Sequence, residues 1–150
     1  MKANRKKIYL VRHGETEYNK LGMVQGSGID SNLNETGKIQ AKAFFEAYKN
    51  VYFDKVYTSK LRRTHQSVAQ FIEKDIPWQQ LYGLNEISWG HKEGRSTTAA
   101  DNEQYVNMLY AWSQGDYTQK VYGGESPTEV QERHKVALKY ILSNEEEETI

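Results

Sequence analysis

Cysteine is absent from the 150 residues of this chain, and no apolar run is long enough to cross a bilayer. The first absence excludes a disulfide framework and a thiolate metal site, and it is compatible with a reducing cytosol. The basic start, residues 1–7, lacks the apolar core of a signal peptide and is predicted to be a solvated tail. We therefore expect a cytoplasmic protein without a membrane partner.

An excess of charge of either sign is absent as well, because 20 Lys and Arg residues balance 20 Asp and Glu residues. Nucleic-acid-binding domains are usually basic on one face, so this balance gives no reason to expect a nucleic-acid partner. Neither a repeat nor a linker interrupts the sequence. The length is that of one ordinary domain with a real core, and we expect a single domain over residues 1–150.

Short strands and amphipathic helices alternate along the chain. Apolar, β-prone residues predict strands at 8–11, 55–58 and 78–81. Apolar residues at helical spacing predict helices at 34–48, 59–72, 96–115 and 126–142. Alternation of this kind indicates an α/β domain with a largely parallel sheet.

Two of these helices have a predicted core face, and the segment after the last helix has a predicted environment. The core face of the helix at 34–48 is predicted to carry Ile39, Ala43, Phe44, Ala47 and Tyr48. In the helix at 96–115, the predicted core face consists of Tyr105, Val106, Leu109 and Trp112. After the last helix, the acidic run 145–148 is expected to be a solvated connection.

The segment 10–19 carries the residues with the clearest chemical meaning. At the end of a predicted buried strand, Arg12 offers a planar fork of donors suited to a phosphoryl group. Gly14 lets the backbone approach a ligand closely, and the imidazole of His13 can attack phosphorus and carry the group covalently. These residues together predict a phosphate site that includes its own nucleophile.

The run Arg-His-Gly-Glu-Thr-x-x-Asn at 12–19 resembles the signature of the histidine phosphatase superfamily, which includes the cofactor-dependent phosphoglycerate mutases. The resemblance implies a phosphoglycerate mutase-like fold, which is three-layer α/β/α with a mostly parallel sheet. It also implies that His13 is phosphorylated during turnover, while Arg12 and Asn19 hold the phosphoryl group.

Two arginines follow the second predicted strand, in the first turn of the next helix. Basic residues there oppose the helix dipole, so we expect an anion to bind at this point, with Ser59 as the helix cap. The run Ser-Lys-Leu-Arg-Arg at 59–63 resembles the family pattern Ser-x-Leu-x-Arg. That pattern implies that Arg63 is the second phosphate clamp and leaves Arg62 on the surface.

Two further segments extend the resemblance. Gln25-Gly26 resembles a pair common among phosphatase members and implies substrate contact, although turn chemistry explains these residues equally well. The run Leu-Asn-Glu at 84–86, followed by Gly-x-x-Glu-Gly at 90–94, implies that Glu86 is the proton donor. His91 and Glu93 are expected to be structural.

The end of the sequence departs from the family pattern. Thr149 and Ile150 look like the first residues of a further strand, which in the family ends at a second His followed by Gly. Neither His91 nor His134 lies in such a context. We therefore expect a truncated domain that lacks its last strand and helix.

The resemblance implies a phosphatase that hydrolyses a small-molecule phosphomonoester, with no cofactor and no metal. Phosphoryl transfer of the mutase type is an alternative. The mutases, however, carry a longer basic segment after the Glu motif, whereas residues 95–122 hold only two basic residues. A second alternative is a phospho-ligand binding module without turnover, which the missing His makes credible. A homodimer is left open.

Overall fold

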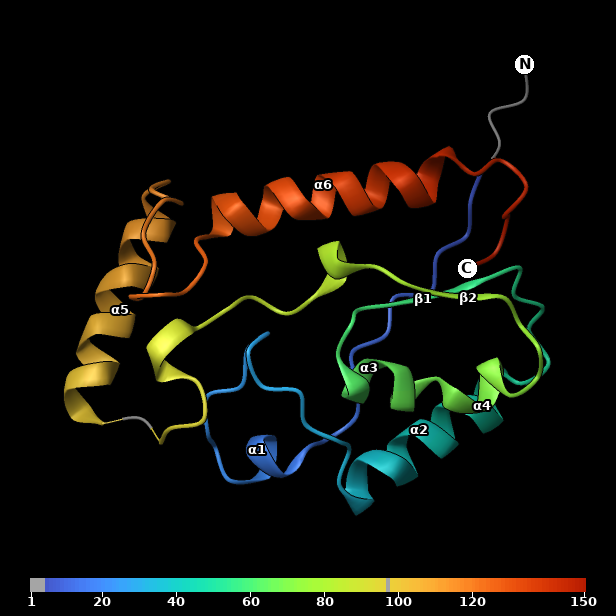
Figure 1. Cartoon of the computed structure of the whole chain (residues 1–150), viewed down its shortest axis with the longest axis horizontal. Helices are drawn as coiled ribbons and strands as arrows, with labels where there is room; N and C mark the ends of the chain where they lie inside the picture. Colours follow the sequence, from blue (N-terminus) through green and yellow to red (C-terminus); the bar gives the residue numbers. More distant parts are fainter. Residues whose placement is uncertain (1–4, 97) are drawn as a thin grey trace.

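Two short parallel strands lie at the centre of the fold. β1 (Val56–Thr58) pairs with β2 (Trp78–Gln80) in register, Val56 opposite Trp78. The computed structural model describes residues 5–96 and 98–150. In it, α6 lies over one side of these strands, and α2, α3 and α4 lie on the other (Figure 1). This arrangement confirms the predicted α/β fold with parallel strands.

The predicted strands at 55–58 and 78–81 and the predicted helices all have counterparts in the structure. The helices and 3-10 turns, in chain order, are α1 (Glu17–Lys20), α2 (Glu35–Tyr48), α3 (Arg62–Ser67), α4 (Ala69–Ile72), η1 (Tyr82–Leu84), η2 (Gly90–Lys92), α5 (Ala99–Ser113) and α6 (Pro127–Ser143). None of the helices within residues 5–96 and 98–150 combines the length and hydropathy that a bilayer-spanning segment needs.

The segment 8–11 corrects one expectation, because it forms no regular strand and is exposed rather than buried. Its main-chain partner is the end of the chain: Tyr9 N donates to Ile150 O at 2.7 Å, and Ile150 N donates to Lys7 O at 2.9 Å. Two residues offer too short an edge for a ladder. The ring of Tyr9 packs against those of Tyr48 and Phe53, at 5.6 and 5.1 Å, whereas Leu10 is 96% exposed.

Helix α2 begins as predicted, but only part of its predicted core face, Phe44 and Tyr48, makes aromatic contacts. The side chain of Asn34 caps it by accepting from Gly37 N at 2.9 Å. Its core contacts come from Phe44 and Phe45, whose ring centroids lie 5.5 and 5.0 Å from that of Phe71. Ile39, placed on the core face by its spacing, is 70% exposed, and Ala43 and Ala47 are exposed as well. Aromatic contact area outweighs small apolar residues in orienting this helix.

The helix predicted at 59–72 is divided in two. Val68, with φ −124° and ψ 12°, leaves helical geometry between α3 and α4. The predicted face of α5 is confirmed in part: the rings of Tyr105 and Trp112 lie 5.8 and 6.4 Å from that of Trp89. Val106, however, is 60% exposed, and Met108 is the buried residue of this helix. Helix α5 lies at one end of the molecule (Figure 1), away from the layer of α2, so its apolar residues are mostly left on the surface.

The acidic run after α6 is not simply solvated. Glu147 is buried, accepts from Tyr57 Oη at 2.7 Å and from Asn144 Nδ2 at 2.6 Å, and pairs with Lys55 at 3.4 Å. Lys6, from the segment predicted to be a solvated tail, donates to Asn144 O at 2.7 Å. These contacts tie the two ends of the chain together. Residues 1–4 of the predicted tail lie outside the described part.

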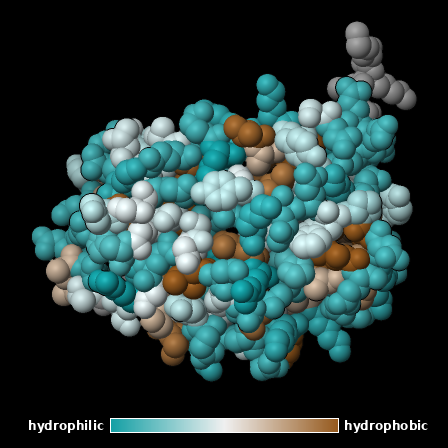
Figure 2. All heavy atoms as spheres, in the orientation of Figure 1, coloured by the Kyte–Doolittle hydropathy of each residue, from teal (hydrophilic) through white to brown (hydrophobic). Residues whose placement is uncertain are grey.

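The face seen in Figure 2 is mostly hydrophilic, with apolar atoms in separate spots rather than in one large patch. The buried apolar core consists of Leu33, Phe53, Leu61, Phe71, Met108, Val121, Ala137 and Ile141.

Candidate active site

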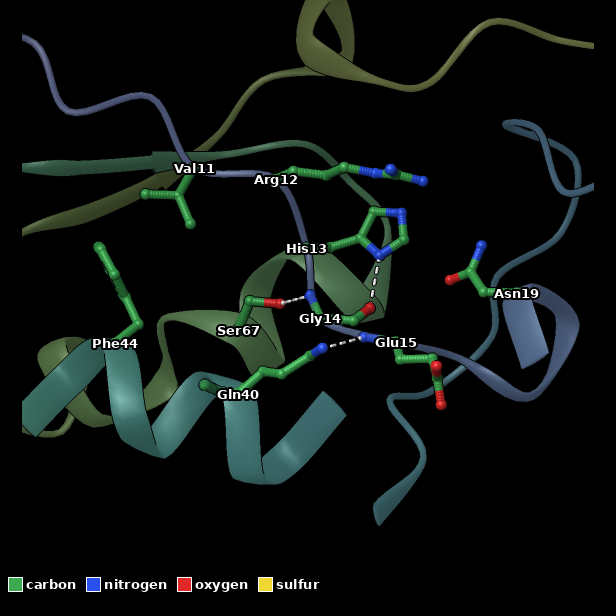
Figure 3. A pocket seen from close by; sticks show the side chains of 10 residues that line it. Val11, Arg12, His13, Gly14, Glu15, Asn19, Gln40, Phe44 and Ser67 are labelled. Atoms are coloured by element: carbon green, nitrogen blue, oxygen red, sulfur yellow. Dashed lines mark hydrogen bonds between the residues drawn. The ribbon is translucent and has the colours of Figure 1, made fainter. Parts of the chain in front are cut away.

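A hollow of about 390 Å³ opens where the segment 11–15 passes in front of α2 and α3 (Figure 3). Arg12, His13, Gly14 and Asn19 line it together, so four residues singled out by the sequence are brought to one place. Gln40 and Phe44 of α2 and Ser67 of α3 complete its walls. In Figure 3 the side chains of Arg12 and His13 extend in the same direction, toward the side where Asn19 lies.

The imidazole of His13 is held in one tautomer. Its Nδ1 lies 2.7 Å from Gly14 O, and because a carbonyl oxygen only accepts, Nδ1 carries the proton. Burial lowers the pKa of His13 from 6.5, and the positive charges of Arg63 and Arg12 lower it further, against the opposing effects of the Gly14 hydrogen bond and of Glu86. A neutral ring with a hydrogen on Nδ1 leaves a lone pair on Nε2, which is the form that a nucleophile needs.

The backbone beside His13 is fixed by two side chains from the helices behind it. Gly14 N donates to Ser67 Oγ at 2.9 Å, and Ser67 Oγ donates to Arg63 O at 2.7 Å. Glu15 N donates to Gln40 Oε1 at 2.8 Å. Ser67 was missed by sequence reasoning, since a serine inside a helix has no recognisable local pattern.

Arg12 and Asn19 differ in the hydrogen bonds that their side chains make within the protein. The guanidinium of Arg12 is exposed, and within residues 5–96 and 98–150 it makes no hydrogen bond or ion pair. Asn19 Oδ1 accepts from Thr16 N at 3.1 Å, and Thr16 Oγ1 accepts from Asn19 N at 3.2 Å, which together form the capping box of α1. This capping turns the Asn19 side chain toward the hollow.

Arg63 is fully buried beneath the loop 25–30. Its Nη1 donates to Ile29 O at 2.6 Å and its Nη2 to Gly26 O at 3.2 Å. Burial lowers the pKa of its guanidinium, and the charges of Glu86, Asp30 and Glu93 act in the opposite direction. The Nε atom is buried and has no partner among the described residues.

Arg62 is on the surface, as predicted, but the anion expected at the start of this helix comes from the protein itself. The carboxylate of Asp30 accepts from Arg62 N at 2.7 Å and pairs with Arg62 Nε at 3.1 Å. The prediction that Ser59 caps the helix is wrong, because Leu61 is the N-cap residue of α3. Ser59 Oγ accepts from Leu61 N at 3.1 Å instead. A free anion-binding turn is therefore not present here, because Asp30 already occupies it.

Gln25 and Gly26 do not line the hollow around His13. Gln25 Oε1 accepts from Thr16 Oγ1 at 2.8 Å and from Ser31 Oγ at 2.7 Å, so its carbonyl end fastens the loop to the start of α1. Gly26 packs tightly, since a Cβ there would lie 2.5 Å from Ile87 O. In this structure both residues shape the loop that covers Arg63.

Glu86 lies at the edge of a second hollow, of about 640 Å³, between the loop 85–89 and α6. Its side chain is exposed, and its Oε1 accepts from the next amide, Ile87 N, at 3.0 Å. The negative charge of Glu86 acts to raise the pKa of both His13 and Arg63, against the larger effect of burial. Glu86 and Arg63 do not line the hollow around His13, so their roles as proton donor and second clamp stay predictions.

The residues expected to be structural make structural contacts. Glu93 Oε1 accepts from Trp89 N at 2.9 Å and from Ser88 Oγ at 3.3 Å, and His91 Nδ1 bonds Tyr122 O at 3.0 Å. Among the described residues, no cluster of three or more His, Asp or Glu side chains could hold a metal ion.

Comparison with known proteins gives a consistent result. The family whose model matches residues 8–150 is described as the histidine phosphatase superfamily, branch 1. A fructose-2,6-bisphosphatase TIGAR B of Danio rerio is 34% identical over 148 residues, which are 94% of this chain and 55% of the relative. The phosphoserine phosphatase 1 of Hydrogenobacter thermophilus is 30% identical over 145 residues, 96% of this chain and 68% of that one.

Solved structures agree with these relatives. The alpha-ribazole phosphatase from Shigella flexneri matches with a TM-score of 0.79 at 25% identity, over 95% of this chain and 70% of that one. The likeness confirms the phosphoglycerate mutase-like α/β fold. The chain spans about half the length of several curated relatives, 55% of the Danio rerio protein and 49% of the Xenopus tropicalis TIGAR.

Proposed function

Because the chain belongs to the histidine phosphatase superfamily, we propose that it hydrolyses phosphomonoesters through a phosphohistidine on His13. The observation that carries this proposal is the state of the ring: Nδ1 is bound to Gly14 O at 2.7 Å, and burial favours the neutral form. Nε2 is then the free nucleophilic atom, in a hollow that also holds Arg12.

The first half of the reaction transfers the phosphoryl group. Nε2 of His13 attacks phosphorus in line with the ester bond, so an N–P bond forms while the bond to the leaving oxygen breaks. Arg12 and Asn19, which line the hollow, match the charge spread over the phosphoryl oxygens, and the positive charge of the buried Arg63 also acts on this site. Glu86, in its acid form, gives its proton to the leaving oxygen. Acid catalysis of this kind is worth about 10²–10⁴-fold in rate.

The second half returns the enzyme to its starting state. The Glu86 carboxylate takes a proton from water, whose oxygen attacks phosphorus, and the N–P bond breaks to release inorganic phosphate. No step of this sequence requires a cofactor or a metal ion. The roles of Gln25 and Gly26 are to hold the loop above Arg63. Gln25 contacts substrate through its amide nitrogen, which donates to no group in the part of the chain that the structure describes.

The substrate class that we propose is a small phosphorylated metabolite. The relatives named as fructose-2,6-bisphosphatase, phosphoserine phosphatase and alpha-ribazole phosphatase support it. Phosphoryl transfer of the mutase type is less well supported, because the segment 95–122 is occupied mainly by α5 and holds two basic residues. A binding module without turnover is the remaining alternative.

Hydrolysis of an aryl phosphate, together with trapping of the phosphoenzyme, tests the proposal. The wild-type chain is expected to release phosphate and to carry an acid-labile phosphoryl group on His13, detected by mass spectrometry of a rapidly quenched reaction. His13→Ala is expected to lose both signals and to keep the fold. Tight phosphate binding without any turnover would favour the binding module instead.

Three wider properties complete the proposal. We propose that residues 1–150 act as one domain, since α6 contacts η1 and the strands pair across the centre. A cytoplasmic location fits the absence of cysteine, and cell fractionation tests it. Dimerisation is tested by sedimentation over a range of concentrations.

A further inference from the structure

We propose that Arg133, supported by Glu125, is a positioning residue that holds the loop carrying Glu86 in its working place. The inference rests on the proposed function, because it assigns Arg133 a part in acid catalysis. Arg133 lies within α6, on the opposite side of this loop from the segment that carries His13, and no pattern in the sequence singled it out.

The guanidinium of Arg133 binds the main chain of the Glu86 loop at three points. Its Nη1 donates to Gly83 O at 3.0 Å and to Asn85 O at 2.7 Å, while Nη2 donates to Glu86 O at 3.0 Å. The guanidinium also lies over the Tyr82 ring, 5.9 Å from its centroid. A planar fork with several donors can hold several carbonyls at once, and no other side chain offers this.

Glu125, in the run Gly-Gly-Glu-Ser at 123–126, binds both the guanidinium of Arg133 and the Glu86 loop. Its two oxygens accept from Arg133 Nε at 2.8 Å and from Arg133 Nη2 at 2.9 Å, and Oε2 also accepts from Ser88 N at 2.8 Å. Although burial alone would raise it, the hydrogen bonds from Arg133 and Ser88 hold the pKa of Glu125 below its usual range. The pair thus grips the loop on both sides of Glu86, from Gly83 to Ser88.

Apart from the main chain of the loop, few contacts fix the side chain of Glu86. Its side chain is exposed, and among the described residues its carboxylate bonds only to the neighbouring amide of Ile87. The position of the carboxyl group is therefore set by the main chain of the loop. Arg133 makes no contact with the hollow around His13, so it acts through Glu86 and not on the phosphoryl group.

This role has a kinetic signature that a loss of stability does not share. A misplaced acid matters for a poor leaving group, which must be protonated as it departs, and hardly matters for a phenolate that leaves unaided. Loosening the clamp should lower kcat/KM for an alkyl phosphate by about 10²-fold, the effect of a misplacement of about 1 Å. Hydrolysis of 4-nitrophenyl phosphate should change far less.

The test compares Arg133→Gln, Arg133→Lys and Glu86→Gln with wild type on glycerol phosphate and 4-nitrophenyl phosphate. Lys120→Gln is the matched control, because Lys120 pairs with Glu129 at the start of the same helix, at 2.6 Å, away from the Glu86 loop. Arg133→Gln is expected to show the leaving-group dependence of Glu86→Gln. Arg133→Lys, which keeps the charge but not the fork, should fall between them and wild type. Equal losses of Arg133→Gln on both substrates would overturn the inference.

Amide hydrogen exchange separates this inference from the proposed function. In Arg133→Gln the amides at 84–88 should exchange faster, while those of α2 stay unchanged, whether or not the chain is active. If exchange at 84–88 does not change, the clamp is refuted even in an active enzyme. If exchange rises but wild type hydrolyses neither phosphate, the proposed function fails and the catalytic role of Arg133 fails with it.

Discussion

Gly14, next to the nucleophile, lies backbone to backbone against Gly37 of α2: a Cβ on Gly14 would sit 2.7 Å from Gly37 O. The two glycines allow the N-terminal turn of α2 to come directly under the segment 13–15. Asn34 N donates to Glu15 O at 3.0 Å across the same contact. The position of His13 therefore depends on a helix residue that carries no side chain.

Replacing Gly37 by alanine should destabilise the protein, although alanine is the better helix former by about 1 kcal/mol. The added methyl group meets the backbone of Glu15, and overpacking of this kind costs about 1–3 kcal/mol. Urea denaturation measures the change. Thr36→Ala is the control, because Thr36 is exposed in the same turn and should follow helix propensity. A more stable Gly37→Ala would mean that the two backbones are not in contact.

Arg63 and Arg62 should behave differently when each is replaced. Arg63→Ala removes the Arg63 donors of Ile29 O and of Gly26 O. Gly26 O still accepts from Ile29 N at 3.4 Å, so the cost is about 1–3 kcal/mol for Ile29 O. Arg62→Ala loses an exposed pair with Asp30, worth at most about 1 kcal/mol. Thermal unfolding measures both effects, and titration with inorganic phosphate should show weaker binding for Arg63→Lys than for Arg62→Ala. Equal phosphate affinities would remove Arg63 from the phosphate site.

Part of this site could be predicted because its residues are local in sequence. Arg12, His13, Gly14 and Asn19 belong to one recognisable run and line one hollow, although no regular strand precedes them. The supports were not predictable, because Ser67, Gly37 and Arg133 act through contacts between segments far apart in the chain. Asp30 is another such case: it supplies the anion that the start of α3 was expected to take from a ligand.

The exposed and buried faces were also harder to predict than the elements. Spacing alone placed Ile39 and Val106 in the core, yet neither has a neighbouring layer to cover it. Glu147, in a run of four acidic residues, is buried because Tyr57 and Asn144 bind it. A partner distant in sequence decides such cases, and periodicity contains no information about it.

Activity should fall as the pH is lowered through the pKa of His13, which burial and two arginines place below 6.5. The protonated ring has no lone pair on Nε2, so kcat/KM should keep most of its value at about pH 6.5 and decline below it.

The free energy of unfolding should also decrease as the pH is lowered through the pKa of His13. The unfolded chain binds a proton at His13 at higher pH than the folded chain does, so lowering the pH favours unfolding. His13→Gln should lose less stability than wild type between about pH 7.5 and about pH 5.5; an equal loss would mean that the pKa is not depressed.

Glu147 should matter far more for stability than its neighbour Glu146. Glu147→Ala leaves Lys6 and Lys55 without their carboxylate partner, and breaking a buried pair costs about 3–5 kcal/mol. Glu146→Ala changes an exposed side chain and should stay within about 0.5 kcal/mol of wild type. Chemical denaturation of both variants decides. Similar denaturation midpoints for the two variants would mean that this segment is the solvated connection expected from its charge.

The last prediction concerns the segment 8–11 as an open edge. Tyr9 turns inward, with its ring 5.1 Å from that of Phe53, so Ile8 and Leu10 point outward and are 49% and 96% exposed. Tyr9 N is taken by Ile150 O, whereas within the described residues the amides of Ile8 and Leu10 donate to no other backbone group. An apolar edge with free amides pairs readily with another chain.

The 150-residue chain should therefore associate as its concentration rises, and Leu10→Lys should suppress this association, since a charged edge residue opposes pairing. Val136→Lys, on the exposed side of α6 at 72% exposure, is the control and should associate like wild type. Light scattering over a concentration series measures all three; a monodisperse wild type, or equal suppression by both lysines, would show that this edge does not drive association.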